Sequence, residues 1–200
     1  MLEAGHGASM GKADLVDLRV LIVGGTPHAI VALRSAIGLI GISKVDAVAQ
    51  AARALQCLRE KKIDAVFCDE AVESVDGVSF ALAARKAPGV LDPMVPIFLV
   101  CSAPRRRQVE GARDDGLTDV LVRPISAATI IRKLKSAVIA PRPFIVAGGF
   151  FGPDRRSAAR ASYGGANRRT RLPKKLTVTA EAAAALLAAN ADVDGLTDGG

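Results

Sequence analysis

The chain has 200 residues, half of them hydrophobic, and carries a net charge of +7 at pH 7. This length suits one medium-sized domain with additional segments, and the composition allows a sizeable core. One tyrosine, no tryptophan and three cysteines without metal-ligand spacing argue against an aromatic ligand cage and a cysteine metal centre, and no apolar run approaches the ~20 residues of a membrane helix.

The first residues predict a flexible leader. Residues 1–17 are rich in glycine and polar residues, and they lack the apolar core of a secretory signal. The three cysteines, Cys57, Cys68 and Cys101, are expected to be buried free thiols in a reduced cytosol. We therefore expect a soluble, cytoplasmic protein.

Short apolar strands and amphipathic helices alternate from Arg19 onward. The expected strands cover residues 20–23, 45–48, 65–68, 97–101 and 120–122. The expected helices begin at Pro27 and run to Ile40, and then cover 51–60, 78–86, 105–114 and 127–138. Five strand–helix pairs with short loops predict a doubly wound α/β domain with a five-stranded parallel sheet over residues 18–140.

The character of the chain changes after Pro141. Residues 142–175 hold nine Lys or Arg and one Asp, and glycine and proline interrupt any periodicity. The extension 141–176 is therefore predicted to be basic and extended or disordered on its own. Within 177–200, Thr179 is expected to cap a short helix that ends in acidic residues.

The carboxyl ends of the predicted strands locate the candidate site. In doubly wound sheets the functional crevice lies at these ends. Gly24, Asp69, Cys101 and Arg123 follow four different strands, so we expect them to converge there.

The order of these features resembles the receiver domain of bacterial two-component response regulators, which has the CheY-like, flavodoxin-like fold. The resemblance covers roughly residues 19–138. Its carriers are Val20-Leu21-Ile22-Val23, Asp69 with Asp76-Gly77 downstream, Val95-Pro96-Ile97, and Arg123-Pro124. Each motif is short, and their order and spacing together carry the resemblance.

The resemblance implies that Asp69 stands where the family accepts a phosphoryl group from a histidine kinase. Two acids at the end of the first strand would hold Mg²⁺ there, and a hydroxyl and a lysine would bind the phosphoryl oxygens. This chain has Gly24 and Gly25 at the acidic positions, Cys101 (followed by Ser102) at the hydroxyl position, and Arg123 at the lysine position. Asp69 alone is expected to hold Mg²⁺ poorly.

Arg123 remains cationic and is expected to clamp Asp69 bidentately. Glu70 or Glu73 would offer other metal ligands, although neither stands where the family places its acids. The leading interpretation is a degenerate receiver without a cofactor or an independent enzymatic activity. It would bind a partner protein of a bacterial signalling pathway without phosphorylation. The alternative is a phosphorylatable single-domain response regulator at Asp69, within a phosphorelay.

The basic extension contains an approximate repeat. Phe151-Gly152-Pro153-Asp154-Arg155-Arg156 is echoed by Tyr163-Gly164-Gly165-Ala166-Asn167-Arg168-Arg169. An arginine pair beside a carboxylate fits the edges of guanine, and the composition loosely resembles the arginine-rich tails of CheY-like proteins that bind cyclic di-GMP. The competing interpretations are a solvated basic linker and a surface for an acidic partner or nucleic acid. Nucleic acid has the weakest support because no recognition helix is evident.

Overall fold

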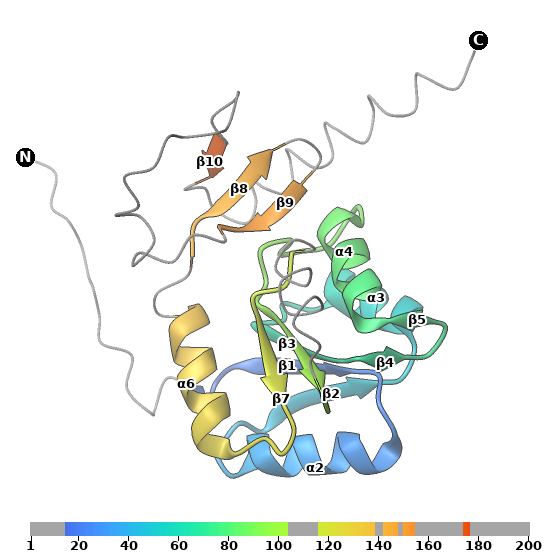
Figure 1. The fold of residues 1–200 in the computed structure, drawn as a ribbon, viewed down its shortest axis with the longest axis vertical. Coiled ribbons are helices and arrows are strands. Elements are labelled where there is room, and N and C mark those ends of the chain that lie inside the picture. The colour runs from blue at the N-terminus through green and yellow to red at the C-terminus, as the bar shows by residue number, and fades with distance from the viewer. Residues whose placement is uncertain (1–14, 104–115, 139–141, 148–149, 155–173, 177–200) are drawn as a thin grey trace, which may run out of the picture.

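The computed structural model describes residues 15–103, 116–138, 142–147, 150–154 and 174–176, in which strands and helices alternate (Figure 1). The central strands are β1 (Arg19–Val23), β2 (Lys44–Val48), β3 (Ala65–Asp69), β6 (Ile97–Cys101) and β7 (Asp119–Val122). The helices are α2 (Pro27–Gly38), α3 (Ala51–Glu60), α4 (Gly77–Lys86) and α6 (Ala127–Val138). The helices predicted over 105–114 and after Thr179 lie outside the described residues.

The five central strands form one parallel sheet in the order β2-β1-β3-β6-β7. Every residue of β3 and β6 is buried, whereas the outer strands β2 and β7 are only partly buried. This explains why the inner strands read as continuous apolar runs, since both of their faces are covered. The predicted doubly wound sheet is confirmed.

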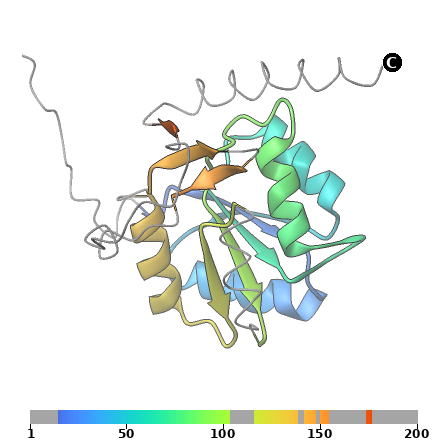
Figure 2. The same cartoon turned by 45° about the horizontal axis from the view of Figure 1, so that its top comes forward.

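Helices α3 and α4 lie on one face of the sheet, and α2 and α6 lie on the other (Figures 1 and 2). A separate hydrophobic cluster covers each face. Alternate strand residues supply them, because successive side chains of a strand point to opposite faces. Leu21 and Val66 belong to the cluster that contains residues of α3 and α4, whereas Ile22 and Phe67 belong to the one that contains residues of α2 and α6. The rings of Phe67 and Phe98 stack with centroids 5.1 Å apart on this second face.

Side chains that follow the strand ends start two of the helices. Thr26 caps α2, and Pro27 occupies its first turn, where the missing proline N–H costs no helical hydrogen bond. Asp76 caps α4 by accepting the backbone N–H groups of Val78 and Ser79, each at 2.9 Å. The hydrogen bond from the Ser79 hydroxyl lowers the pKa of Asp76 below its ordinary value.

The predicted flexible leader, residues 1–17, extends too far along the chain, because Leu15 already belongs to the folded core. Leu15 is fully buried and Leu18 nearly so, and both belong to the cluster on the α2 and α6 face together with Ile37 and Ile40. Because Leu15 and Leu18 are three residues apart, they lie on one side of a single turn. Two apolar residues at this spacing are too few to predict a helix from the sequence. The doubly wound unit of the structure therefore begins at Leu15.

The extension is not wholly extended or disordered, which corrects the prediction for 141–176. It contains β8 (Phe144–Ala147), β9 (Phe150–Pro153) and β10 (Lys174–Leu176), which form an antiparallel sheet in the order β10-β8-β9. The Phe144 and Phe151 rings are buried, with centroids 5.4 Å apart. We call β8 and β9 together the hairpin.

The hairpin lies at the amino ends of the central strands, away from the strand ends that carry Asp69 (Figure 1). Arg85, near the end of α4, contacts the hairpin and is only 1% exposed. Its Nε donates to the carbonyl of Gly116 at 3.1 Å and its Nη1 to that of Pro93 at 2.7 Å. The guanidinium lies over the Phe144 ring, 5.2 Å from the centroid, and its burial lowers the pKa of Arg85 to about 9.

None of the helices in the described ranges is long and apolar enough to cross a membrane. The charged groups of these ranges instead form several partly exposed ion pairs, such as Lys61 with Asp46 at 2.8 Å. Such pairs contribute little to stability. The two apolar clusters therefore hold the doubly wound unit together.

Candidate functional site

Asp69 ends β3 with both carboxylate oxygens already hydrogen-bonded. Oδ1 accepts the backbone N–H of Ala71 at 3.0 Å, and Oδ2 accepts from Nη2 of Arg123. The residue is 9% exposed. Burying a carboxylate is tolerated when such partners satisfy it, so the Arg123 guanidinium and the Ala71 amide stabilise Asp69 as an anion.

Arg123 joins Asp69 to a second pair of side chains. Its Nη1 donates to the Ser102 hydroxyl at 3.0 Å and lies 3.7 Å from Oε1 of Glu70. The same Glu70 oxygen accepts the backbone N–H of Ser102 at 2.9 Å. The expected contact of Arg123 with Asp69 is present, but the fork is divided between Asp69 and Ser102 and is not bidentate on one carboxylate. Because Arg123 follows β7 and Ser102 follows β6, the network spans neighbouring strands.

Gly24 and Gly25 bring the backbone close to Asp69. Both have positive φ, 74° and 86°, a conformation that glycine adopts without strain. Their N–H groups donate to the carbonyls of Val48 and Ala71 at 2.8 and 2.9 Å. A Cβ at Gly25 would lie 2.9 Å from Oδ2 of Asp69, and one at Gly24 would lie 2.8 Å from the carbonyl oxygen of Ala71. The absence of side chains here is a packing requirement.

The segment after Asp69 folds over these glycines. It forms a small antiparallel pair, β4 (Ala71–Val72) and β5 (Val75–Asp76). The N–H of Glu73 donates to the carbonyl of Ala49 at 3.3 Å, so the segment is also fastened to the end of β2. Ala71 and Val72 of this segment consequently fill the place where a side chain on Gly24 would stand, and Asp69 itself fills that of Gly25.

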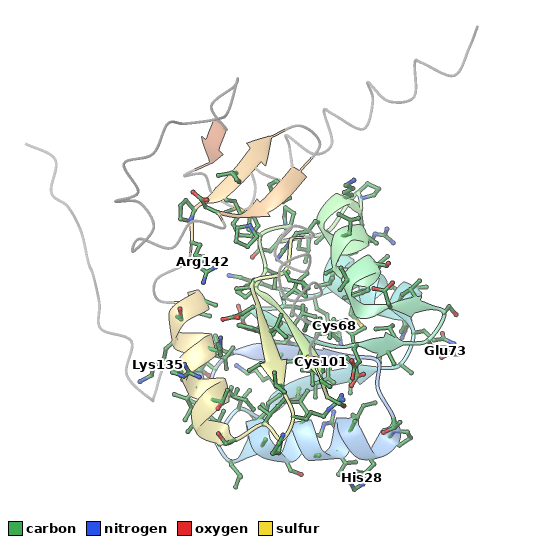
Figure 3. All side chains as sticks on the ribbon, in the orientation of Figure 1. His28, Cys68, Glu73, Cys101, Lys135 and Arg142 are labelled. Atoms are coloured by element: carbon green, nitrogen blue, oxygen red, sulfur yellow. The ribbon has the colours of Figure 1, made fainter. Side chains whose placement is uncertain are left out.

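These residues do not fit a magnesium ion. Mg²⁺ requires oxygen ligands in near-octahedral geometry, usually including one or two carboxylates. Asp69 is engaged by Arg123 and Ala71, Glu70 is engaged by Ser102, and Glu73 is exposed on the overlying segment (Figure 3). In the described part of the chain no group of three acidic, histidine or cysteine side chains is placed to hold a metal.

The cysteines near the site are buried free thiols, as expected (Figure 3). The Cys101 thiol donates to the carbonyl of Leu121 at 3.8 Å. Burial raises the pKa of Cys101, and it raises that of Cys68 much further. Both thiols therefore stay protonated, and Ser102 supplies the hydroxyl of the site.

Most of the predicted ligand-binding residues of the extension lie outside the part of the chain that the structure describes. Arg155, Arg156, Arg168 and Arg169 lie outside the described residues. Asp154 is described, half-buried, and its backbone N–H donates to the carbonyl of Pro143 at 2.7 Å. Their role in nucleotide binding stays a prediction.

Sequence reasoning missed two contributions to the structure around the site. The sequence suggests Glu70 only as a metal ligand, whereas its carboxylate accepts the backbone N–H of Ser102 and lies near Arg123. The sequence does not distinguish Arg85, because an arginine near the end of a helix is ordinarily solvated. Its position among apolar residues of α4, next to Ala84 and Ala81, was the available signal.

Comparisons with known proteins agree with this fold. A family model described as response regulator receiver domain matches residues 20–135. The receiver domain of a sensor histidine kinase from Pseudomonas aeruginosa, crystallised with a magnesium ion in its active site cleft, is 22% identical over 62% of this chain and 98% of its own, with a TM-score of 0.54.

Two further solved structures are similar. A putative response regulator from Chloroflexus aurantiacus is 21% identical over 62% of this chain and 98% of its own, with a TM-score of 0.55. A two-component response regulator from Clostridium difficile is 21% identical over 63% and 98%, with a TM-score of 0.54. The comparison with curated proteins gave no match. These structural likenesses support the fold alone.

Proposed function

The chain belongs to the family of response regulator receiver domains, and from this premise we propose that it serves two-component signalling as a phosphorylation-independent protein-interaction module. Its partner would be a protein of a bacterial signalling pathway. The proposal places the chain in the cytoplasm and assigns it no enzymatic activity of its own.

The engagement of Asp69 carries this proposal. Phosphoryl transfer needs metal charge beside the transferring group and a carboxylate oxygen free to attack. Here both oxygens of Asp69 are bonded, and the neutralising charge comes from Arg123. Because the chain itself supplies this charge, the arrangement resembles a metal-neutralised site that needs no metal. This supports a receiver surface held in one state.

We expect no metal-dependent phosphorylation of the full chain. Incubation with acetyl phosphate and Mg²⁺ should leave the intact mass unchanged, since both oxygens of Asp69 are hydrogen-bonded and the residues around it do not fit a metal. Amide NMR spectra should likewise show no shifts when Mg²⁺ and beryllofluoride are added together. Asp69→Asn is the matched control. A mass gain of one phosphoryl group that needs Mg²⁺ and disappears in Asp69→Asn would establish the phosphorylatable alternative.

The repeated arginine pairs support a second candidate, binding of cyclic di-GMP. Guanidinium groups can stack on guanine or fork onto its O6 and N7. Calorimetry with the full chain should then show heat at tens of micromolar nucleotide, abolished in Arg155→Ala/Arg156→Ala. Arg53→Ala/Arg34→Ala, which removes two exposed arginines of the receiver unit, controls for charge alone. Absence of heat with the wild-type chain would leave the extension as a basic linker.

A further inference from the structure

A cavity of about 550 Å³ opens between α2 and the residues that follow β7. Its sheet side is formed by Ile22, Phe67 and Val100, and Pro124 and Ile125 form the wall after β7. This volume lies within the range of about 300–1,000 Å³ that is typical of small-molecule sites. All of its lining residues belong to the described part of the chain.

Small side chains on α2 leave space for this cavity. Ala29, Ala32 and Ala36 line the cavity at positions i, i+3 and i+7, which share one helix face. Leu33 and Ile37 lie beside them and are buried in the core. His28, Ile30 and Leu33 of α2 also line the cavity, so the alanines widen it between larger neighbours.

One end of the cavity is charged. Asp69 and Arg123 line it, together with Thr26 at the start of α2. A guanidinium has five N–H donors, and hydrogen bonds to described residues account for only two of those of Arg123, one to Asp69 and one to Ser102. The Arg123 side chain is 31% exposed. The Arg123 guanidinium can donate to a second anionic oxygen without releasing Asp69.

We propose that this cavity binds a small amphiphilic carboxylic acid, with its apolar chain between α2 and the sheet and its carboxylate on Arg123. The lining is mainly apolar, so it favours a hydrocarbon body. The free donors of Arg123 and the positive amino end of α2 favour an anionic head. This goes beyond the proposed interaction function, because it adds a chemical input beside Asp69.

Octanoate titrated into the isotopically labelled full chain, followed by amide NMR, tests the site. We expect saturable shifts at submillimolar octanoate in residues 22–36, 67–69 and 123–125. Ala29→Leu/Ala36→Leu fills the cavity and should weaken binding at least tenfold. Ala52→Leu/Ala83→Leu adds the same atoms to exposed positions of α3 and α4 and should leave binding unchanged. Shifts that fail to saturate at millimolar octanoate, or equal weakening in both variants, would overturn the proposal.

The head group is tested separately with 1-octanol. Octanoate should bind about tenfold more tightly than 1-octanol, since a charge-assisted hydrogen bond is roughly twice as strong as a neutral one. Asp69→Asn removes a neighbouring negative charge and should tighten octanoate binding severalfold without affecting 1-octanol. Equal affinities of the two probes would refute an acid as the ligand. These readouts do not depend on phosphorylation or on a partner protein, so they can fail while the proposed function holds.

Discussion

Arg85→Ala is expected to lower the free energy of unfolding by about 3 kcal/mol, because truncation leaves a cavity and two carbonyls unpaired. The two lost hydrogen bonds are those to Gly116 and Pro93, and the contact with the Phe144 ring is lost as well. The cost of burying the guanidinium, which is evident in the lowered pKa of Arg85, limits the effect. Urea denaturation of the full chain measures the change.

Arg59→Ala provides the matched control. Arg59 also lies near the end of a helix and donates to a carbonyl, that of Pro88 at 3.0 Å, but it is exposed. Its loss should change the free energy of unfolding by no more than about 0.5 kcal/mol. Arg85→Met, which keeps most of the volume and removes the buried charge, should cost less than Arg85→Ala, about 1–2 kcal/mol for the unpaired carbonyls.

Hydrogen exchange distinguishes a local role of Arg85 from a general one. If Arg85 fastens the hairpin, the amides of β8 and β9 should lose protection in Arg85→Ala, while those of β1 and β3 keep theirs. Local opening of this kind occurs where few buried contacts hold an element. Unchanged protection of Phe144–Ala147, or unchanged stability, would show that the hairpin does not depend on Arg85.

The receiver unit was predictable because its signals are local. Each of the inner strands β1, β3 and β6 is an apolar run, and Pro27 and the periodicity of α6 mark helices that the structure contains. The approach of Arg123 to Asp69 followed from one topological rule, the convergence of strand ends. The sequence alone could not predict that the Arg123 guanidinium donates to two different side chains, because Ser102, which accepts one of the two hydrogen bonds, follows another strand.

The hairpin was missed because its stability is not local. Phe144–Ala147 and Phe150–Pro153 are too short to form an isolated hairpin that is stable in water, and the surrounding glycines and prolines indicate a break in structure. The Phe144 ring is instead buried beside Arg85, which precedes it by 59 residues in the sequence. The burial of Leu15 against residues of α2 likewise depends on contacts that no short window contains.

Installing the missing acids should fail to create a metal site. Gly24→Asp/Gly25→Asp is expected to lower the free energy of unfolding by about 4 kcal/mol or more. Each substitution places a Cβ in a left-handed conformation, which costs about 1–2 kcal/mol, and forces atoms into a filled space, which costs about 1–3 kcal/mol. A side chain at position 24 would clash with the Ala71 carbonyl, and one at position 25 would clash with the Asp69 carboxylate. The substitution at Gly25 also adds like-charge repulsion with Asp69.

Gly38→Ala separates this effect from the general cost of replacing glycine. Gly38 ends α2 without a positive φ, and a Cβ there would meet no atom within 4 Å, so alanine should stabilise the chain by about 0.5–1 kcal/mol. Denaturation of both variants, with and without Mg²⁺, gives the comparison. If the double acid variant had wild-type stability and Mg²⁺ stabilised it further, the segment over Gly24 and Gly25 would have to move aside at little cost in free energy. The departure from the family pattern would then lie in two side chains and not in the backbone around Asp69.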